Sequence, residues 1–68
     1  MKIKIILERT NNLKVVKLKE GTTVKNLLKK LSLKPDTIIV MKEEIPIPID
    51  YVLNYDQELT IIQVSSGG

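Results

Sequence analysis

The chain begins with alternating apolar and polar side chains. One set of alternating positions is apolar: Met1, Ile3, Ile5 and Leu7. The positions between them are Lys2, Lys4 and Ile6, and Glu8 follows. A period of two is typical of a strand with one buried face. Residues 10–12 (Thr-Asn-Asn) then supply turn chemistry, and a second strand is expected over residues 13–18. The pattern predicts an antiparallel hairpin.

A helical period follows the hairpin. Glu20 and Gly21 interrupt the second strand, and the hydroxyl of Thr22 or Thr23 can cap a helix. Aliphatic residues then recur at i, i+3, i+4 and i+7, which places them on one face: Val24, Leu27, Leu28 and Leu31. This spacing predicts one short amphipathic helix, and residues 34–36 (Lys-Pro-Asp) should end it.

The second half of the chain reads as further strands. Residues 37–41 predict a third strand that is apolar on both faces, with Ile39 and Met41 in the core and Ile38 and Val40 facing outward. Residues 45–49 allow at most a short edge strand, because their two prolines lack an N–H. Residues 50–57 are expected to connect this segment to a last strand that contains Leu59.

This order of elements predicts an α+β fold, in which one helix packs across one face of a mixed four- to five-stranded sheet. The first and last strands should lie side by side and parallel at the centre of the sheet. One domain is expected over residues 1–64, and residues 65–68 should be a flexible tail. The expected core consists of Ile3, Ile5, Leu7, Val16, Leu18, Val24, Leu27, Leu28, Leu31, Ile39, Met41, Ile45, Leu53, Leu59 and Ile61.

Composition narrows the possible chemistry. The 68 residues are 43% hydrophobic and include no cysteine and no histidine. A disulfide scaffold, a Cys/His zinc site, a thiolate nucleophile and a histidine base are therefore excluded, and an independent enzyme is not expected. The longest apolar run covers residues 38–41, far short of the roughly 20 residues of a membrane span. We expect a cytoplasmic protein with no membrane partner and no metal site.

Charge is unevenly distributed. Residues 1–34 carry ten basic and two acidic side chains, a net charge of +8, whereas residues 35–68 carry Lys42 and six acidic side chains, a net charge of −5. A basic half can bind polyanions. However, single-strand binders usually present aromatic rings for stacking, and the only aromatic residues, Tyr51 and Tyr55, lie in the acidic half. Nucleic acid therefore remains a minor alternative.

Two segments carry a family resemblance. Residues 21–31 (GTTVKNLLKKL) resemble a helix entry, and residues 55–68 (YDQELTIIQVSSGG) resemble a closing strand that runs into a diglycine. With the element order, they resemble the β-grasp (ubiquitin-like) fold. More narrowly, the chain resembles the thiamine-pathway carrier ThiS, the molybdopterin-synthase subunit MoaD and the archaeal small modifier proteins. It differs in the turn at residues 42–44 (Lys-Glu-Glu), where the family often has a glycine turn, and in the serine pair before the diglycine.

The resemblance implies a function for the C-terminal carboxylate of Gly68. A partner enzyme of the ubiquitin-activating kind would adenylate it and would supply ATP and Mg²⁺, because the chain itself binds no cofactor. The activated group would become a thiocarboxylate and pass sulfur to a sulfur-accepting synthase for thiamine, molybdopterin or tRNA thiolation. Alternatively, Gly68 would form isopeptide bonds with lysines of target proteins. A non-covalent interaction module is the further alternative.

The tail and one sheet face are the candidate contact regions. Ser65, Ser66 and Gly67 would enter the active site of the partner, because glycine lacks a Cβ and four extended residues span roughly 13–14 Å. The sheet face away from the helix would bind the partner enzyme, with Lys2, Lys4 and Lys17 as a basic rim. Strand propensity alone could also account for its exposed aliphatic residues. The proposed contact residues are Ile6, Val15, Ile38, Val40, Ile62 and Val64.

Overall fold

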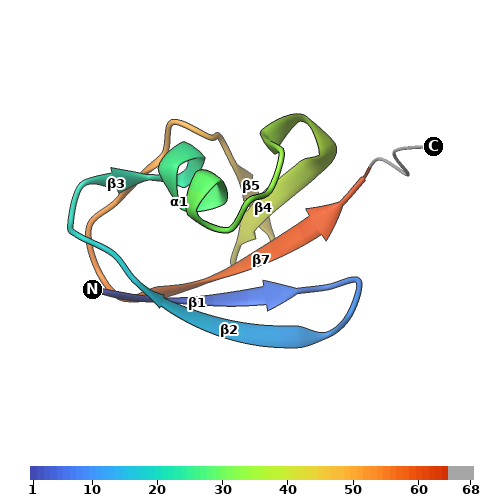
Figure 1. Cartoon of the computed structure of the whole chain (residues 1–68), viewed down its shortest axis with the longest axis horizontal. Coiled ribbons are helices and arrows are strands. Elements are labelled where there is room, and N and C mark those ends of the chain that lie inside the picture. Colours follow the sequence, from blue (N-terminus) through green and yellow to red (C-terminus); the bar gives the residue numbers. More distant parts are fainter. Residues whose placement is uncertain (65–68) are drawn as a thin grey trace.

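A computed structural model of the chain describes residues 1–64; residues 65–68, the predicted tail, lie outside the described part. The elements are β1 (Lys2–Leu7), β2 (Asn12–Lys17), β3 (Thr22–Thr23), α1 (Val24–Lys30), the 3₁₀ helix η1 (Pro35–Thr37), β4 (Ile38–Lys42), β5 (Ile45–Ile47), β6 (Val52–Leu53) and β7 (Gln57–Gln63). In this part of the chain, five strands form a sheet of order β2-β1-β7-β4-β5, and β3 pairs with β6. Helix α1 lies across one face of the larger sheet (Figure 1).

The centre of the sheet is the parallel pair of the first and last strands. Ile5 of β1 lies opposite Leu59 of β7, and the pair is flanked by β2 and β4, which run antiparallel to their neighbours. The two ends of the chain thus contribute adjacent strands, as the sequence predicts. The mixed sheet with a helix across one face confirms the expected α+β architecture.

The hydrophobic core lies between α1 and the sheet. Its buried residues in the described part of the chain are Ile3, Ile5, Val24, Leu27, Leu28, Val40, Leu53, Leu59 and Ile61. Each aliphatic side chain that is fully buried contributes about 1.5–3 kcal/mol relative to an exposed one. Since a domain of this length has little interior, these few side chains hold the helix on the sheet.

The helix begins where the sequence suggests but ends earlier. Its N-cap is Thr23, whose Oγ1 accepts a hydrogen bond of 3.3 Å from the backbone N–H of Asn26. At the other end, Ser32 takes a left-handed conformation with φ 59°, and the N–H of Leu33 donates to the carbonyl of Leu28 at 2.9 Å. This backbone motif closes the helix after Lys30, so the prediction that residues 34–36 end it was wrong.

A two-stranded pairing holds the start of the helix. Thr22 pairs with Leu53 and Thr23 with Val52, within the segment that the sequence analysis treats as a plain connection. The same segment accepts hydrogen bonds from the first turn of α1, where the N–H of Val24 donates to the carbonyl of Tyr51 at 3.0 Å. Residues 50–57 therefore cap the helix through their backbone, a role that no side-chain pattern indicates.

Strand β4 has the opposite phase to the predicted one. Val40 is only 3% exposed and faces the core, and Ile38 packs against the core as well, whereas Ile39 is 38% exposed. Met41 belongs to the same outer row as Ile39. The assignment of Ile39 and Met41 to the core, and of Ile38 and Val40 to the outer face, was wrong. A strand that is apolar on both faces has no polar position to set its phase, so its pairing with β7 decides it.

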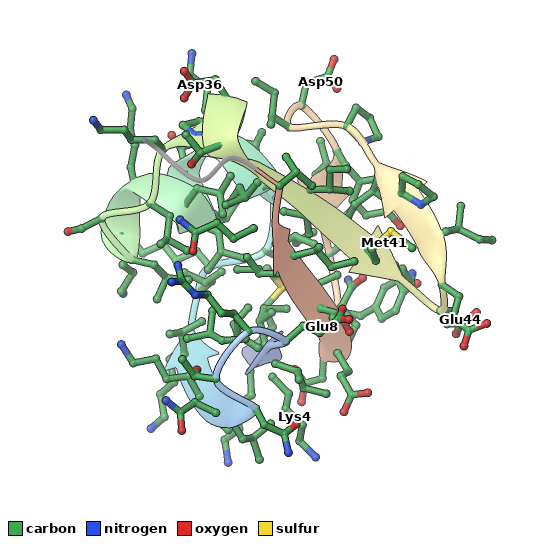
Figure 2. All side chains as sticks on the ribbon, turned by 90° about the vertical axis from the view of Figure 1, so that its right-hand side faces the viewer. Lys4, Glu8, Asp36, Met41, Glu44 and Asp50 are labelled. Atoms are coloured by element: carbon green, nitrogen blue, oxygen red, sulfur yellow. The ribbon has the colours of Figure 1, made fainter. Side chains whose placement is uncertain are left out.

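The β4–β5 hairpin also moves one expected core residue to the surface. Ile45 is 64% exposed, because it pairs with Lys42 at the tip of the hairpin and on the free edge of the sheet. Figure 2 shows the neighbouring Glu44 at this tip, remote from the helix. Burial decreases toward the end of an edge strand, so apolar character alone overestimates the core there.

Candidate functional site

The described part of the chain ends on the central strand of the sheet, β7. The backbone N–H of Val64 donates to the carbonyl of Thr37 at 3.0 Å, which extends the pairing of β7 with β4 by one residue. Because β7 lies between β1 and β4, residues 65–68 follow directly from the central strand of the sheet. Gly68 and its three predicted neighbours, Ser65, Ser66 and Gly67, lie outside the described residues.

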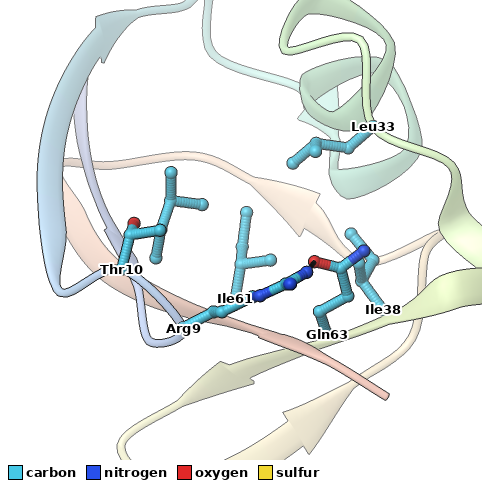
Figure 3. A pocket seen from close by; sticks show the side chains of 7 residues that line it. Arg9, Thr10, Leu33, Ile38, Ile61 and Gln63 are labelled. Atoms are coloured by element: carbon cyan, nitrogen blue, oxygen red, sulfur yellow. Dashed lines mark hydrogen bonds between the residues drawn. The ribbon is translucent and has the colours of Figure 1, made fainter. Parts of the chain in front are cut away.

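A hollow lies on the helix side of the sheet, beside the start of the tail (Figure 3). Its volume is about 350 Å³, and its lining consists of Leu7, Arg9, Thr10, Leu33, Ile38, Ile61 and Gln63. At its rim, the Nη1 of Arg9 donates to the Oε1 of Gln63 at 3.1 Å. Sequence reasoning missed this hollow, since only the parallel pairing of β1 and β7 brings Arg9 next to Gln63. The hollow can accept an apolar group beside one guanidinium.

The sheet face away from α1 is apolar over much of its area, and we call it the outer face. The strand pairings place four of the predicted contact residues on it: Ile6, Val15, Ile62 and Val64. The other two, Ile38 and Val40, face the core. Their places on the outer face are taken by residues that the sequence analysis did not assign to it: Leu13, Ile39 and Met41.

At one end of the outer face, basic and acidic side chains lie on different strands. Lys2 and Lys17 are paired on β1 and β2, and Lys4 lies opposite Glu58 of β7. A further hollow on the β4–β7 side is lined by Lys42, Glu43, Glu44, Glu58 and Thr60. Figure 2 shows Lys4 on the side of the sheet remote from α1. The predicted basic rim therefore occupies the β1–β2 side, and acidic side chains occupy the β4–β7 side.

Lys42 lies in a corner formed by two tyrosines. Its ammonium donates hydrogen bonds to the phenol oxygens of Tyr55 and Tyr51, and it lies 4.7 Å from the ring centroid of Tyr55. The hydrogen bond to Tyr55, and then that to Tyr51, raises the pKa of Lys42 above its ordinary value. Hydrogen bonds to the charged form favour that form, so the two phenol groups stabilise the ammonium form of Lys42.

Two further questions about residues 1–64 concern metal sites and membrane-spanning helices. Within this range, no three acidic side chains are grouped closely enough to hold a metal ion. No helix of the same range has the length and apolar character needed to cross a membrane. The described residues thus offer one largely apolar sheet face and several hollows.

Comparison with known structures identifies the fold. A ubiquitin from Caldiarchaeum subterraneum matches with a TM-score of 0.80, covering 100% of this chain and 98% of that protein at 20% sequence identity. At this identity the likeness concerns the fold alone. It confirms the predicted β-grasp architecture.

Comparison of sequences identifies the family. An uncharacterized protein of Archaeoglobus fulgidus is 35% identical over 48 residues, which are 71% of this chain and 70% of that protein. The family model described as small archaeal modifier protein 2 matches residues 1–64, the whole of the described part. The chain therefore belongs to the small archaeal modifier protein 2 family of ubiquitin-like proteins.

Proposed function

We propose that the protein is a carrier whose Gly68 carboxylate is activated by an adenylating enzyme. The observation that supports this most directly is a diglycine placed just beyond the central strand in a member of a small-modifier family. A carboxylate is a poor electrophile. In the proposed step, a carboxylate oxygen attacks the α-phosphorus of ATP, pyrophosphate leaves, and the resulting acyl adenylate can be attacked by a nucleophile.

In the first fate of this adenylate, the protein carries sulfur. Hydrosulfide supplied by a partner attacks the acyl carbon and displaces AMP, and Gly68 becomes a thiocarboxylate that a sulfur-accepting synthase uses for thiamine, molybdopterin or tRNA thiolation. The chain contains no cysteine, so both the activation and the sulfur come from partners. The chain body serves for recognition.

In the second fate, the protein modifies other proteins. A lysine amine of a target displaces AMP and forms an isopeptide bond with Gly68. The description of the matching family as a modifier favours this candidate. Both fates share the adenylation step, and they differ only in the nucleophile that follows.

Adenylation is tested with the adenylating enzyme of the same organism and ATP–Mg²⁺. The full chain should support exchange of labelled pyrophosphate into ATP, whereas a variant that lacks Gly68 should not. Equal exchange with both proteins, or none with either, would overturn the proposal. In that case a non-covalent role, which needs no terminal glycine, would explain the molecule better.

The two fates are separated by mass spectrometry on protein from native cells. An exchange of oxygen for sulfur at Gly68 indicates the carrier, and branched peptides on target lysines indicate the modifier. Because the chain has no lysine or arginine after Lys42, trypsin would leave all of residues 43–68 on a target lysine. The substitution Ser66→Arg shortens this remnant to Gly-Gly, and the same variant without Gly68 is the matched control.

Docking of the enzyme on the outer face is tested with two matched isoleucines. Ile39 lies on the outer face and is 38% exposed, whereas Ile49 is 43% exposed and its carbonyl accepts a hydrogen bond from the N–H of Lys25 in α1. Ile39→Lys should raise the KM for adenylation by about tenfold, since one buried apolar contact is worth roughly that factor. Ile49→Lys should leave the KM unchanged. Equal KM values for the two variants, both folded by circular dichroism, would rule out this surface.

A further inference from the structure

The free edge of β2 carries unpaired backbone groups in a regular alternation. The N–H and carbonyl of Leu18 both bond to the first residue, at 2.9 and 2.8 Å. In an antiparallel pair such doubly bonded positions recur at every second residue. Residues 12, 14 and 16 therefore point their backbone groups toward β1, and Leu13, Val15 and Lys17 point theirs away from the sheet. Within the described chain, β2 is an end strand with no neighbour on that side.

Two contacts support this alternation. The N–H of Glu8 donates to the carbonyl of Ile61 at 3.1 Å, so the even-numbered residues of β1 bond to β7 and its odd-numbered residues bond to β2. On the free edge, the Nζ of Lys30 donates to the carbonyl of Lys17 at 3.4 Å, as expected for a carbonyl that points outward. The other outward groups, at Leu13 and Val15, have no such contact among residues 1–64.

The opposite edge of the sheet is closed by proline. Pro46 lies in register with Met41 of β4, but proline has no N–H to donate. Doubly bonded positions alternate in an antiparallel pair, so Ile45 and Ile47 bond to β4 and the backbone of Pro46 faces outward. Pro48 occupies the next outward position, just after the last paired residue of β5. Neither has an N–H to donate, and the carbonyl of Pro48 already accepts a bond from Tyr51 at 3.1 Å. Proline at outward positions prevents the addition of a strand. β2 has no proline, so of the two edges only that of β2 can accept a further strand.

The side chains of β2 indicate which strand would fit. On the outer face, Leu13 and Val15 are 58% and 56% exposed, and an added strand would cover them with apolar side chains of its own. On the helix side, Lys14 projects from β2, and the Nζ of Lys30 in α1 reaches the carbonyl of Lys17. A strand there would place every second side chain beside these lysines, where acidic residues are favoured.

We propose that the free edge of β2 binds an extended segment of a partner protein, in which apolar and acidic residues alternate, as a sixth strand of the sheet. The backbone groups of Leu13, Val15 and Lys17 would supply the hydrogen bonds, and the lysines would supply the charge selection. A second copy of the chain is disfavoured at this edge, because β2 carries two lysines and no acidic side chain, so two copies of it would bring only like charges to one edge. The proposal concerns a surface separate from the tail and does not depend on adenylation.

The first test is an NMR titration of the full chain with the capped peptide Val-Glu-Val-Glu-Val-Glu. Saturating peptide should slow hydrogen exchange at least tenfold at the amides of Leu13, Val15 and Lys17. The amides of Lys14 and Val16 already bond to β1 and should change little. Raising the salt concentration should weaken binding, and the peptide Val-Lys-Val-Lys-Val-Lys should bind at least tenfold more weakly.

The second test introduces a proline at an outward position of β2, as β5 already has. Val15→Pro removes the outward N–H without removing a bond to β1, and it should weaken peptide binding at least tenfold. Val15→Thr keeps the N–H and the strand propensity and should bind within about twofold of the original chain. Dispersed amide spectra establish that both variants are folded. If Val15→Pro does not fold, the alternating exchange pattern of the unmodified chain still decides the question.

Four results would overturn the proposal. They are an absence of binding, shifts on the outer face without slowed exchange at residues 13, 15 and 17, unchanged binding by a folded Val15→Pro, and equal binding of the lysine peptide. If the same three amides become protected without peptide as the protein concentration rises, a second copy occupies the edge and the assignment to an acidic segment is wrong.

Discussion

Several turns place residues other than glycine in the left-handed region of backbone space. Asn11, Ser32, Glu43 and Glu44 have φ values of 56°, 59°, 50° and 66°. Asparagine tolerates this region through local hydrogen bonds, whereas serine and glutamate are less suited to it. These residues lie in the turns between elements and not in the core, so a single substitution can remove the strain at each of them.

Ser32→Gly should stabilise the protein. Glycine adopts the left-handed conformation without a Cβ penalty, and part of this gain is offset by its greater freedom in the unfolded chain, leaving a net gain of about 0.5–1 kcal/mol. Urea unfolding measures the difference. Ser32→Ala keeps the Cβ and serves as the control; an equal gain with alanine would show that backbone strain at this position is not the cause.

The Lys42 corner should show a defined pH response. Its folded-state pKa lies above the unfolded value of 10.5, so its hydrogen bonds stabilise the fold below pH 10.5, and that contribution is lost as the pH rises through the folded-state pKa. Tyr55→Phe removes the largest cause and should lower the pKa of Lys42. NMR titration of the Lys42 side chain measures the shift. An unchanged or higher midpoint would contradict the assigned hydrogen bond.

At the scale of elements, the β4–β5 hairpin combines a favourable register with an unfavourable turn. Lys42 pairs with Ile45, which leaves a two-residue loop with positive φ at both positions. Asn-Gly is the preferred sequence for such a turn. Glu43 and Glu44 occupy it here, in a hollow that also contains Glu58. The tip of this hairpin therefore combines backbone strain at Glu43 and Glu44 with negative charge on three glutamates.

The double substitution Glu43→Asn and Glu44→Gly should raise the free energy of unfolding by about 1–2 kcal/mol, because both residues then suit the turn. Thermal and urea unfolding provide the measurement. Glu20→Gln, a change of charge at another exposed position, is the control for charge alone. A gain of the same size in the control would assign the effect to charge and not to turn geometry.

Local patterns predict most elements of this fold. The period of two in β1 and the helical spacing from Val24 to Leu31 locate their elements, and the prolines at 46 and 48 correctly indicate an edge strand. Sequence patterns do not predict features that depend on residues far apart along the chain. The phase of β4 depends on β7, the pairing of β3 with β6 depends on backbone bonds alone, and the hollow beside Arg9 exists only after β1 and β7 are aligned.

At the scale of the whole molecule, one buried cluster joins the helix to the sheet. In the described part of the chain this cluster extends from Ile3 to Ile61, and the family model matches residues 1–64. Under the proposed function, this part of the chain recognises the partner enzyme, and the terminal residues that follow it carry the reactive carboxylate.

Because the family model matches residues 1–64, we expect a chain shortened to these residues to fold with a free energy of unfolding within about 0.5 kcal/mol of the full chain. It should also compete with the full chain for the adenylating enzyme while forming no adenylate. Unfolding curves and competition kinetics measure the two properties. A large loss of stability would show that the last four residues belong to the folded body.

The central position of β7 has a consequence for protein synthesis. While the ribosome has not yet released the segment around residues 57–63, the nascent chain holds the β1–β2 and β4–β5 hairpins but lacks the strand that joins them. Pairings so distant along the chain form late and slowly. A translation product truncated before β7 therefore cannot assemble this sheet, so the fold itself separates chains that lack this strand from chains that contain it.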